Sequence, residues 1–272
     1  MGRGQWIAVA CAVALLLLTY LGCPIRPPEE GAALDQAPLE ATGLQSLIRS
    51  ARADLSPAQM ATLASLEERL ETQTDPEKRT EILEQLAGEW YRAGQPAISG
   101  VYAVEIAEEV NTAEAWGIAG TTFTLCLQRE DAEGKNRQFC GQQAERAYQN
   151  AISLDPANPD HRINLALAYV DNPPPDEPMR AVLMLKDLEA QYPENARVYL
   201  TLGQLSVKTG QLENAAKRYA QAAQLEPNNP DAVCQLARLY EQLGQTDEAT
   251  FYGDHCEKLV RELRARRAAA TD

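Results

Sequence analysis

Hydrophobic residues recur at helical spacing along most of the chain. The clearest short example follows Ser56-Pro57, a pair that suits the N-cap and the first position of a helix. After this pair, one apolar stripe with a period of three to four residues is formed by Met60, Leu63, Leu66 and Leu70. No segment alternates apolar and polar residues for long enough to predict a sheet. The pattern therefore predicts an all-α chain, with a helical N-terminal extension over residues 42–76.

One segment near the N-terminus is apolar on every side. From Trp6 to Gly22 there are 17 residues without a charge, which is close to the length needed to cross a bilayer. Arg3 precedes the run, and this favours a cytoplasmic N-terminus. We therefore predict an N-terminal signal-anchor, or transmembrane segment, over residues 1–25, with membrane contact through residues 6–22.

The anchor is followed by a proline-rich stretch, residues 26–41, which we interpret as a linker. Gly22 and Cys23 fit a lipoprotein signal, whereas the bulky Leu21 and the following Pro24 do not. Two alternatives remain: a retained anchor, which we favour, and a cleaved lipoprotein with Cys23 as the lipidation site. Both place the rest of the chain outside the cytoplasm.

A repeat occupies the C-terminal two thirds of the chain. Pro156, Pro193 and Pro227 close similar phrases, and the last two prolines are 34 residues apart. The segment from Ala196 resembles the tetratricopeptide repeat, a helix-turn-helix unit of 34 residues. The matching positions are Tyr199, Leu202, Gly203, Gly210, Ala215, Tyr219, Ala222 and Pro227, and Ser206 replaces an aromatic residue. In this pattern the small residues let two helices approach closely, and Gly210 permits the turn.

Four further repeats can be placed by the same 34-residue phase, three before this segment and one after it. This gives about five repeats over residues 80–263. The second carries an insertion at residues 127–139, and the third has a long turn before Pro178, where we expect its second helix to begin. Residues 264–272 form a basic tail. The expected fold is thus an all-α, helix-turn-helix solenoid behind one N-terminal membrane segment.

The resemblance implies where a partner would bind. In this family the first helix of each repeat lines a concave groove that takes a protein or peptide. Carried onto this sequence, the groove positions are Ile163, Leu167, Arg197, Leu200, Gln204 and Arg238. Three of them, Ile163, Leu167 and Leu200, would form an apolar centre. The alternative is that these residues are ordinary solvated helix faces.

Four cysteines lie in the repeats, and no two of them form a Cys-x-x-Cys motif. Cys126 and Cys140 flank the insertion, and Cys234 and Cys256 fall at the same end of the last helix pair. Each pair forms either a disulfide, which requires an oxidising compartment, or two free, half-buried thiols. The two histidines, His161 and His255, are far apart in sequence, so no metal site is predicted.

Charge and missing motifs exclude other functions. A net charge of −14 repels nucleic acid. The chain has no glycine-rich phosphate loop, no His-Glu-x-x-His and no nucleophile elbow. We therefore expect no catalysis, no cofactor and no small-molecule substrate.

The whole plan resembles single-pass, membrane-anchored tetratricopeptide repeat proteins of the bacterial envelope. That resemblance implies a non-enzymatic adaptor or scaffold that holds a protein partner during assembly of an envelope complex; cytochrome c maturation is one such system. One alternative is a lipoprotein component of an outer-membrane secretion or assembly machine. Another is an import-type receptor on an organelle, whose repeats would face a reducing cytosol and carry no stable disulfide.

Overall fold

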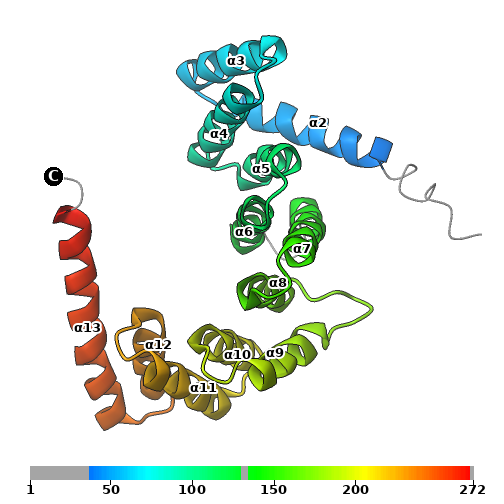
Figure 1. The fold of residues 1–272 in the computed structure, drawn as a ribbon. Helices are drawn as coiled ribbons and strands as arrows, with labels where there is room; N and C mark the ends of the chain where they lie inside the picture. Colours follow the sequence, from blue (N-terminus) through cyan, green and yellow to red (C-terminus); the bar gives the residue numbers. More distant parts are fainter. Residues whose placement is uncertain (1–36, 130–133, 270–272) are drawn as a thin grey trace, which may run out of the picture. The chain divides into compact units, whose positions relative to one another are not determined.

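The computed structural model describes residues 37–129 and 134–269, and this part of the chain contains twelve helices (Figure 1). It divides into two units, Met1–Asp54 and Leu55–Asp272. The described part of the first unit is helix α2 (Ala37–Ala53), which begins inside the predicted linker 26–41. The predicted anchor at residues 6–22 and Cys23 lie outside the described residues. Among the described helices, none combines the length and the apolar character required to cross a membrane.

The second unit opens with helix α3 (Pro57–Thr72) at the predicted site. Ser56 is its N-cap: the Ser56 hydroxyl accepts a hydrogen bond from the Gln59 backbone, and the Ser56 backbone donates to Gln59 Oε1 at 3.0 Å. This reciprocal pair satisfies two backbone donors that the helix itself leaves free. Leu63 and Leu66 are buried, and α3 packs against the next helix.

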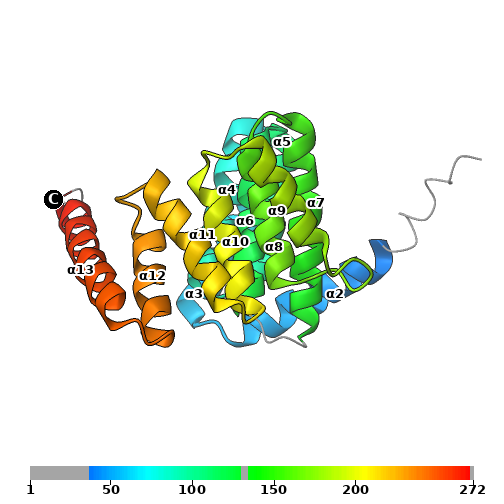
Figure 2. The ribbon, with the colours of Figure 1, turned by 90° about the horizontal axis from the view of Figure 1, so that it is seen from below.

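Five helical hairpins follow, each packed on the next (Figures 1 and 2). We call the first helix of each hairpin an A helix and the second a B helix. The A helices are α4 (Pro76–Arg92), α6 (Ala113–Arg129), α8 (Pro159–Asp171), α10 (Ala196–Lys208) and α12 (Pro230–Gln242). The B helices are α5 (Pro96–Val110), α7 (Lys135–Leu154), α9 (Arg180–Gln191), α11 (Leu212–Leu225) and α13 (Thr246–Ala269).

The turns have the residues that their geometry requires. Gly94, Gly210 and Gly244 have φ angles of 78°, 72° and 72°, a left-handed conformation that glycine adopts without the steric cost of a Cβ. Asparagine side chains begin three A helices by accepting hydrogen bonds from backbone nitrogens two residues ahead. These caps are Asn158 on α8, Asn195 on α10 and Asn229 on α12.

Close packing within two hairpins depends on glycine. A Cβ on Gly203 would lie 2.5 Å from the ring of Tyr219, and a Cβ on Gly120 would lie 2.6 Å from the ring of Tyr148. Both rings are buried and belong to the B helix of the same hairpin. The glycines therefore let a tyrosine lie flat against the A helix, which agrees with the packing role inferred for Gly203.

Several boundaries differ from the sequence prediction. Much of the insertion at 127–139 is helical, because α6 continues to Arg129 and α7 begins at Lys135. Helix α9 begins at Arg180 rather than Pro178, and the predicted tail 264–272 is helical as far as Ala269. The segments at 127–139 and 264–269 are rich in helix-forming residues, and a family pattern based on short helices underestimates such extensions. The later start of α9 is a shortening instead, because a turn precedes it in which the Arg180 backbone nitrogen donates to the Glu177 carbonyl at 2.9 Å.

The structure brings both cysteine pairs together. Cys126 on α6 and Cys140 on α7 form a disulfide with an S–S distance of 2.04 Å, and both residues are fully buried. Cys234 on α12 and Cys256 on α13 form the second disulfide. Each bridge therefore connects the A and B helices of one hairpin.

Candidate partner-binding surface

One cavity opens on the A helices of the second, third and fourth hairpins. It has a volume of about 490 Å³. Helices α6 and α8 supply most of its lining, and α10 supplies one residue. We call it the A-helix pocket; the lining residues used below are Gly117, Ile118, Thr121, Thr122, Asp160, His161, Asn164 and Arg197.

Arg197 joins α10 to α8 at the edge of the A-helix pocket. Its guanidinium lies 2.7 Å from Asp160 Oδ1 and donates to Asn164 Oδ1 at 2.6 Å. Its backbone nitrogen donates to the side chain of the N-cap residue Asn195, which fixes the start of α10. Arg197 and Asp160 remain partly exposed. The pair therefore presents both a cationic and an anionic group to a partner.

His161 forms a buried polar part of the same pocket. Only 8 % of its surface is exposed, and its Nδ1 has no hydrogen-bond partner among the described residues. The imidazole fits because residue 117 is glycine: a Cβ there would lie 3.0 Å from His161 Cε1. A buried polar atom without a partner costs about 1–3 kcal/mol. A ligand group that reached this nitrogen would recover part of that cost.

Ile118 supplies an apolar contact surface beside these polar groups. It is 57 % exposed, so most of this side chain is available for contact with a partner. The neighbouring hydroxyls of Thr121 and Thr122 each donate to a backbone carbonyl of α6 at 2.9 Å, which reduces their demand for water. Beneath them Tyr148 donates to Thr121, and burial raises the pKa of Tyr148, which keeps its phenol neutral. The arrangement suits recognition of an apolar side chain flanked by polar groups.

The apolar centre expected from the sequence is only partly exposed. Ile163 is 1 % exposed and belongs to the core, so it cannot contact a partner at this surface. Leu200 is half-buried and packs on a cluster that contains Tyr219 and Leu236. Ile163 is covered because α8 packs against both α6 and α10, and Leu200 is partly covered because α10 packs against α11.

The other groove positions have separate environments. Arg197 is the one member of the expected set that lines the A-helix pocket. Leu167 is half-buried, and Arg238 is exposed on α12 outside the pocket. Gln204 is half-buried, and its Oε1 has no partner in the described chain.

Ile118, Asp160, His161 and Asn164 were missed by sequence reasoning. One available signal was charge: Asp160 and Arg197 are the second residues of α8 and α10, with opposite charges at equivalent positions. The exposure of Ile118 had no such signal. Within the described residues, no group of three His, Cys, Asp or Glu side chains is placed to hold a metal ion.

Comparison with known families finds one match. Residues 207–251 match the tetratricopeptide repeat family, a segment that spans the α10–α11 turn, all of α11 and α12, and the start of α13. No curated protein matches the sequence significantly.

Solved structures with similar folds include TTC0263, a thermophilic tetratricopeptide repeat protein of Thermus thermophilus. It shares 20% identity with this chain at a TM-score of 0.50, with coverage of 71% of this chain and 98% of that one. MamA from Desulfovibrio magneticus RS-1 shares 18% identity at a TM-score of 0.40, over 68% and 96% of the two chains. PilW, a type IV pilus biogenesis factor, shares 19% identity at a TM-score of 0.47, with coverage of 67% of this chain and 78% of that one. Residues 207–251 thus match the tetratricopeptide repeat family, and the hairpins of this chain have the fold of a solved tetratricopeptide repeat protein.

Proposed function

We propose that this chain is a non-enzymatic adaptor that binds a segment of a partner protein in the A-helix pocket. The observation that carries this proposal is the open side chain of Ile118 beside the Arg197–Asp160 pair. Helical repeats of this fold serve mainly as interaction scaffolds, because stacked hairpins offer an extended surface. A partner segment would cover Ile118 with an apolar side chain and direct polar groups toward Arg197 and His161.

We expect substitution of the pocket to abolish partner capture. The test uses the intact chain, isolated from its native membranes with bound proteins, as wild type and as the Ile118→Glu/Arg197→Glu variant. Burying two new carboxylates against a partner segment costs several kcal/mol, so specific partners should be depleted at least tenfold by quantitative mass spectrometry.

The matched control is Leu183→Glu, because Leu183 is similarly exposed but lies on α9 outside the pocket. Circular dichroism of both variants verifies that helicity is unchanged. If every captured protein is retained by the pocket variant, the partner binds elsewhere. Turnover of a substrate by the isolated chain would contradict the non-enzymatic assignment.

The adaptor would be tethered to a membrane by residues 6–22, with the hairpins on the extracytoplasmic side. Two observations support this placement: the uncharged run follows Arg3, and both disulfides of the hairpins need an oxidising compartment to persist. Its role there would be to hold a partner during assembly of an envelope complex, for example in cytochrome c maturation. A lipoprotein acylated at Cys23, in an outer-membrane secretion or assembly machine, is the alternative, supported by the Gly22-Cys23 pair.

Intact mass and a thiol count on the native protein should separate these placements. A retained anchor predicts the full chain with two reactive thiols, Cys11 and Cys23, because the other four cysteines are paired. Loss of residues 1–22 together with added acyl chains would instead support the lipoprotein. Six reactive thiols would contradict both and place the hairpins in a reducing compartment.

A further inference from the structure

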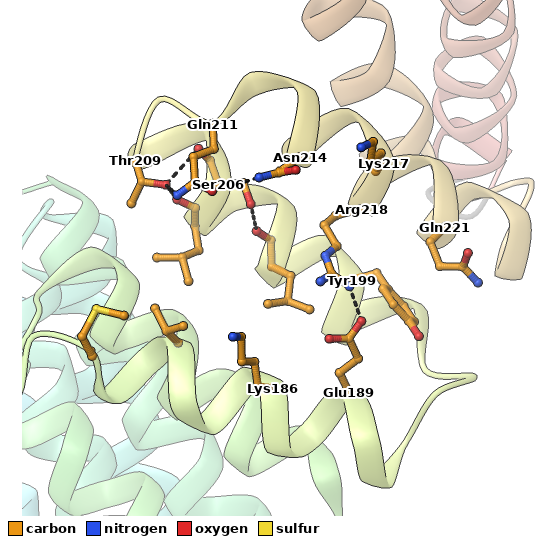
Figure 3. Close-up of a pocket in the computed structure, with 14 residues that line it drawn as sticks. Lys186, Glu189, Tyr199, Ser206, Thr209, Gln211, Asn214, Lys217, Arg218 and Gln221 are labelled. Atoms are coloured by element: carbon orange, nitrogen blue, oxygen red, sulfur yellow. Dashed lines mark hydrogen bonds and ion pairs between the residues drawn. The ribbon is translucent and has the colours of Figure 1, made fainter.

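A second cavity lies on the other side of α10, between the B helices α9 and α11 (Figure 3). Its volume is about 870 Å³, and it shares no lining residue with the A-helix pocket. Lys186 and Glu189 line it from α9, and Lys217 and Arg218 line it from α11. Leu202 and Ser206 of α10 form part of its floor. We call this cavity the B-helix groove.

The groove exists because the fourth hairpin lacks an aromatic side chain. The position of Ser206 in the repeat is occupied in the other four hairpins by Trp90, Phe123, Tyr169 and Tyr240. The rings of Phe123 and Tyr169 fill the space between the preceding B helix and their own. Phe123 lies against Gly100 of α5 and 5.9 Å from Phe139 of α7.

Tyr169 repeats this arrangement one hairpin later. Its hydroxyl donates to Glu145 of α7 at 2.7 Å, and Arg180 of α9 lies 4.8 Å above its ring. Ser206 is too short to reach across the equivalent space, and its hydroxyl donates to the Leu202 carbonyl of its own helix at 2.9 Å. An aromatic ring is therefore missing where the chain elsewhere provides one.

The walls of the groove are cationic, although the chain as a whole has a net charge of −14. Glu189 forms an ion pair with Arg218. Lys186 and Lys217 are exposed, and neither has an ion-pair partner among the described residues. Many other cations of the hairpins, such as Lys208 with Asp171, are paired. Two unpaired lysines across a groove attract carboxylates.

We propose that the B-helix groove binds an acidic segment of a partner protein that carries one aromatic side chain. The ring enters the space above Ser206 and contacts Leu202 and Leu205, while flanking carboxylates pair with Lys186 and Lys217. This gives the chain a second docking site, independent of the A-helix pocket. Buried aromatic anchors with charged neighbours are the groups that dominate binding energy at protein interfaces.

The first test measures binding of a fluorescent synthetic peptide, with one phenylalanine flanked on both sides by glutamates, to the full-length chain in detergent. Binding should weaken at least tenfold when the phenylalanine is replaced by alanine or the glutamates by glutamines, and also in the Lys186→Glu/Lys217→Glu variant. The matched control, Lys78→Glu/Lys258→Glu, makes the same change in net charge at exposed sites outside the groove. It should bind within about twofold of wild type. Equal weakening by both variants, or no binding at millimolar peptide, would overturn the proposal.

The second test fills the groove. Ser206→Tyr restores the aromatic residue of the other hairpins, so the chain should fold and its Tm should rise by about 2–4 °C, while peptide binding is lost. Val207→Tyr places the same ring on the adjacent exposed position and should bind normally. Unchanged binding by Ser206→Tyr would place the peptide elsewhere. The Ile118→Glu/Arg197→Glu variant should still bind the peptide, which separates the B-helix groove from the function proposed for the A-helix pocket.

Discussion

Replacing Phe123 by alanine should lower the free energy of unfolding by about 3–5 kcal/mol. The ring is 0 % exposed and touches helices on both sides of α6. Its removal loses the transfer free energy of a whole aromatic side chain and leaves a cavity between rigid backbones, which can collapse only partly. Chemical denaturation followed by circular dichroism measures the effect.

Phe251→Ala is the matched control, because Phe251 is 66 % exposed on α13. Removing an exposed ring of this kind should change the unfolding free energy by no more than about 0.5 kcal/mol. Equal destabilisation by the two substitutions would contradict the packing described for α6. If only Phe123→Ala lowers the free energy of unfolding strongly, the aromatic ring at this repeat position fills space between helices. The small Ser206 at the equivalent position would then leave that space open.

Removing the first disulfide should cost about 3 kcal/mol under oxidising conditions. The Cys126–Cys140 bridge closes a sequence separation of 14 residues, and this restricts the unfolded chain. It joins the last turn of α6 to the second turn of α7. The Cys126→Ser/Cys140→Ser variant should therefore unfold at lower denaturant than wild type, measured without reductant.

Reductant provides the control for this prediction. Reduction breaks both bridges of the wild type, whereas in the serine variant it can break only Cys234–Cys256. The gap in unfolding free energy between the two proteins should therefore shrink after reduction. A variant as stable as the oxidised wild type would mean that the bridge contributes nothing to stability.

The two proposed docking surfaces have different physical origins. The A-helix pocket is lined by groups that packing leaves unsatisfied: the side chain of Ile118 is exposed, and Nδ1 of His161 has no hydrogen-bond partner among the described residues. The B-helix groove exists because an aromatic ring is missing: Ser206 replaces the aromatic residue of the other hairpins. Since both adjoin α10, partner segments on its two sides could be held close together by one hairpin.

Local features of the fold were predictable from the sequence. The repeat pattern predicted that Gly210 permits a turn, and this glycine has a positive φ angle, as do Gly94 and Gly244 at the equivalent turns. Ser56-Pro57 begins α3 as predicted. These features depend on residues close together in sequence, where backbone sterics and hydrogen bonding act directly.

The solvent exposure of individual side chains was not predictable from the sequence in the same way. Ile118 and Ile163 are both isoleucines on A helices one hairpin apart, yet one is 57 % exposed and the other is buried. Ile163 lies on α8, which packs against both α6 and α10, whereas Ile118 lies one position further along its own repeat and is left open. These contacts join residues tens of positions apart, so local spacing does not reveal them.

The sequence by itself determined the helical period, the repeat and its turns, because these follow from local spacing, from caps and from glycine. It also identified Ser206 as the departure from the aromatic pattern. Only the tertiary structure decided what that departure does: the missing ring leaves a groove between α9 and α11. Lys186 and Lys217 lie on its opposite walls, and neither has an ion-pair partner in the part of the chain that the structure describes. Residues separated in sequence meet there through packing, and packing is a property of the whole hairpin stack.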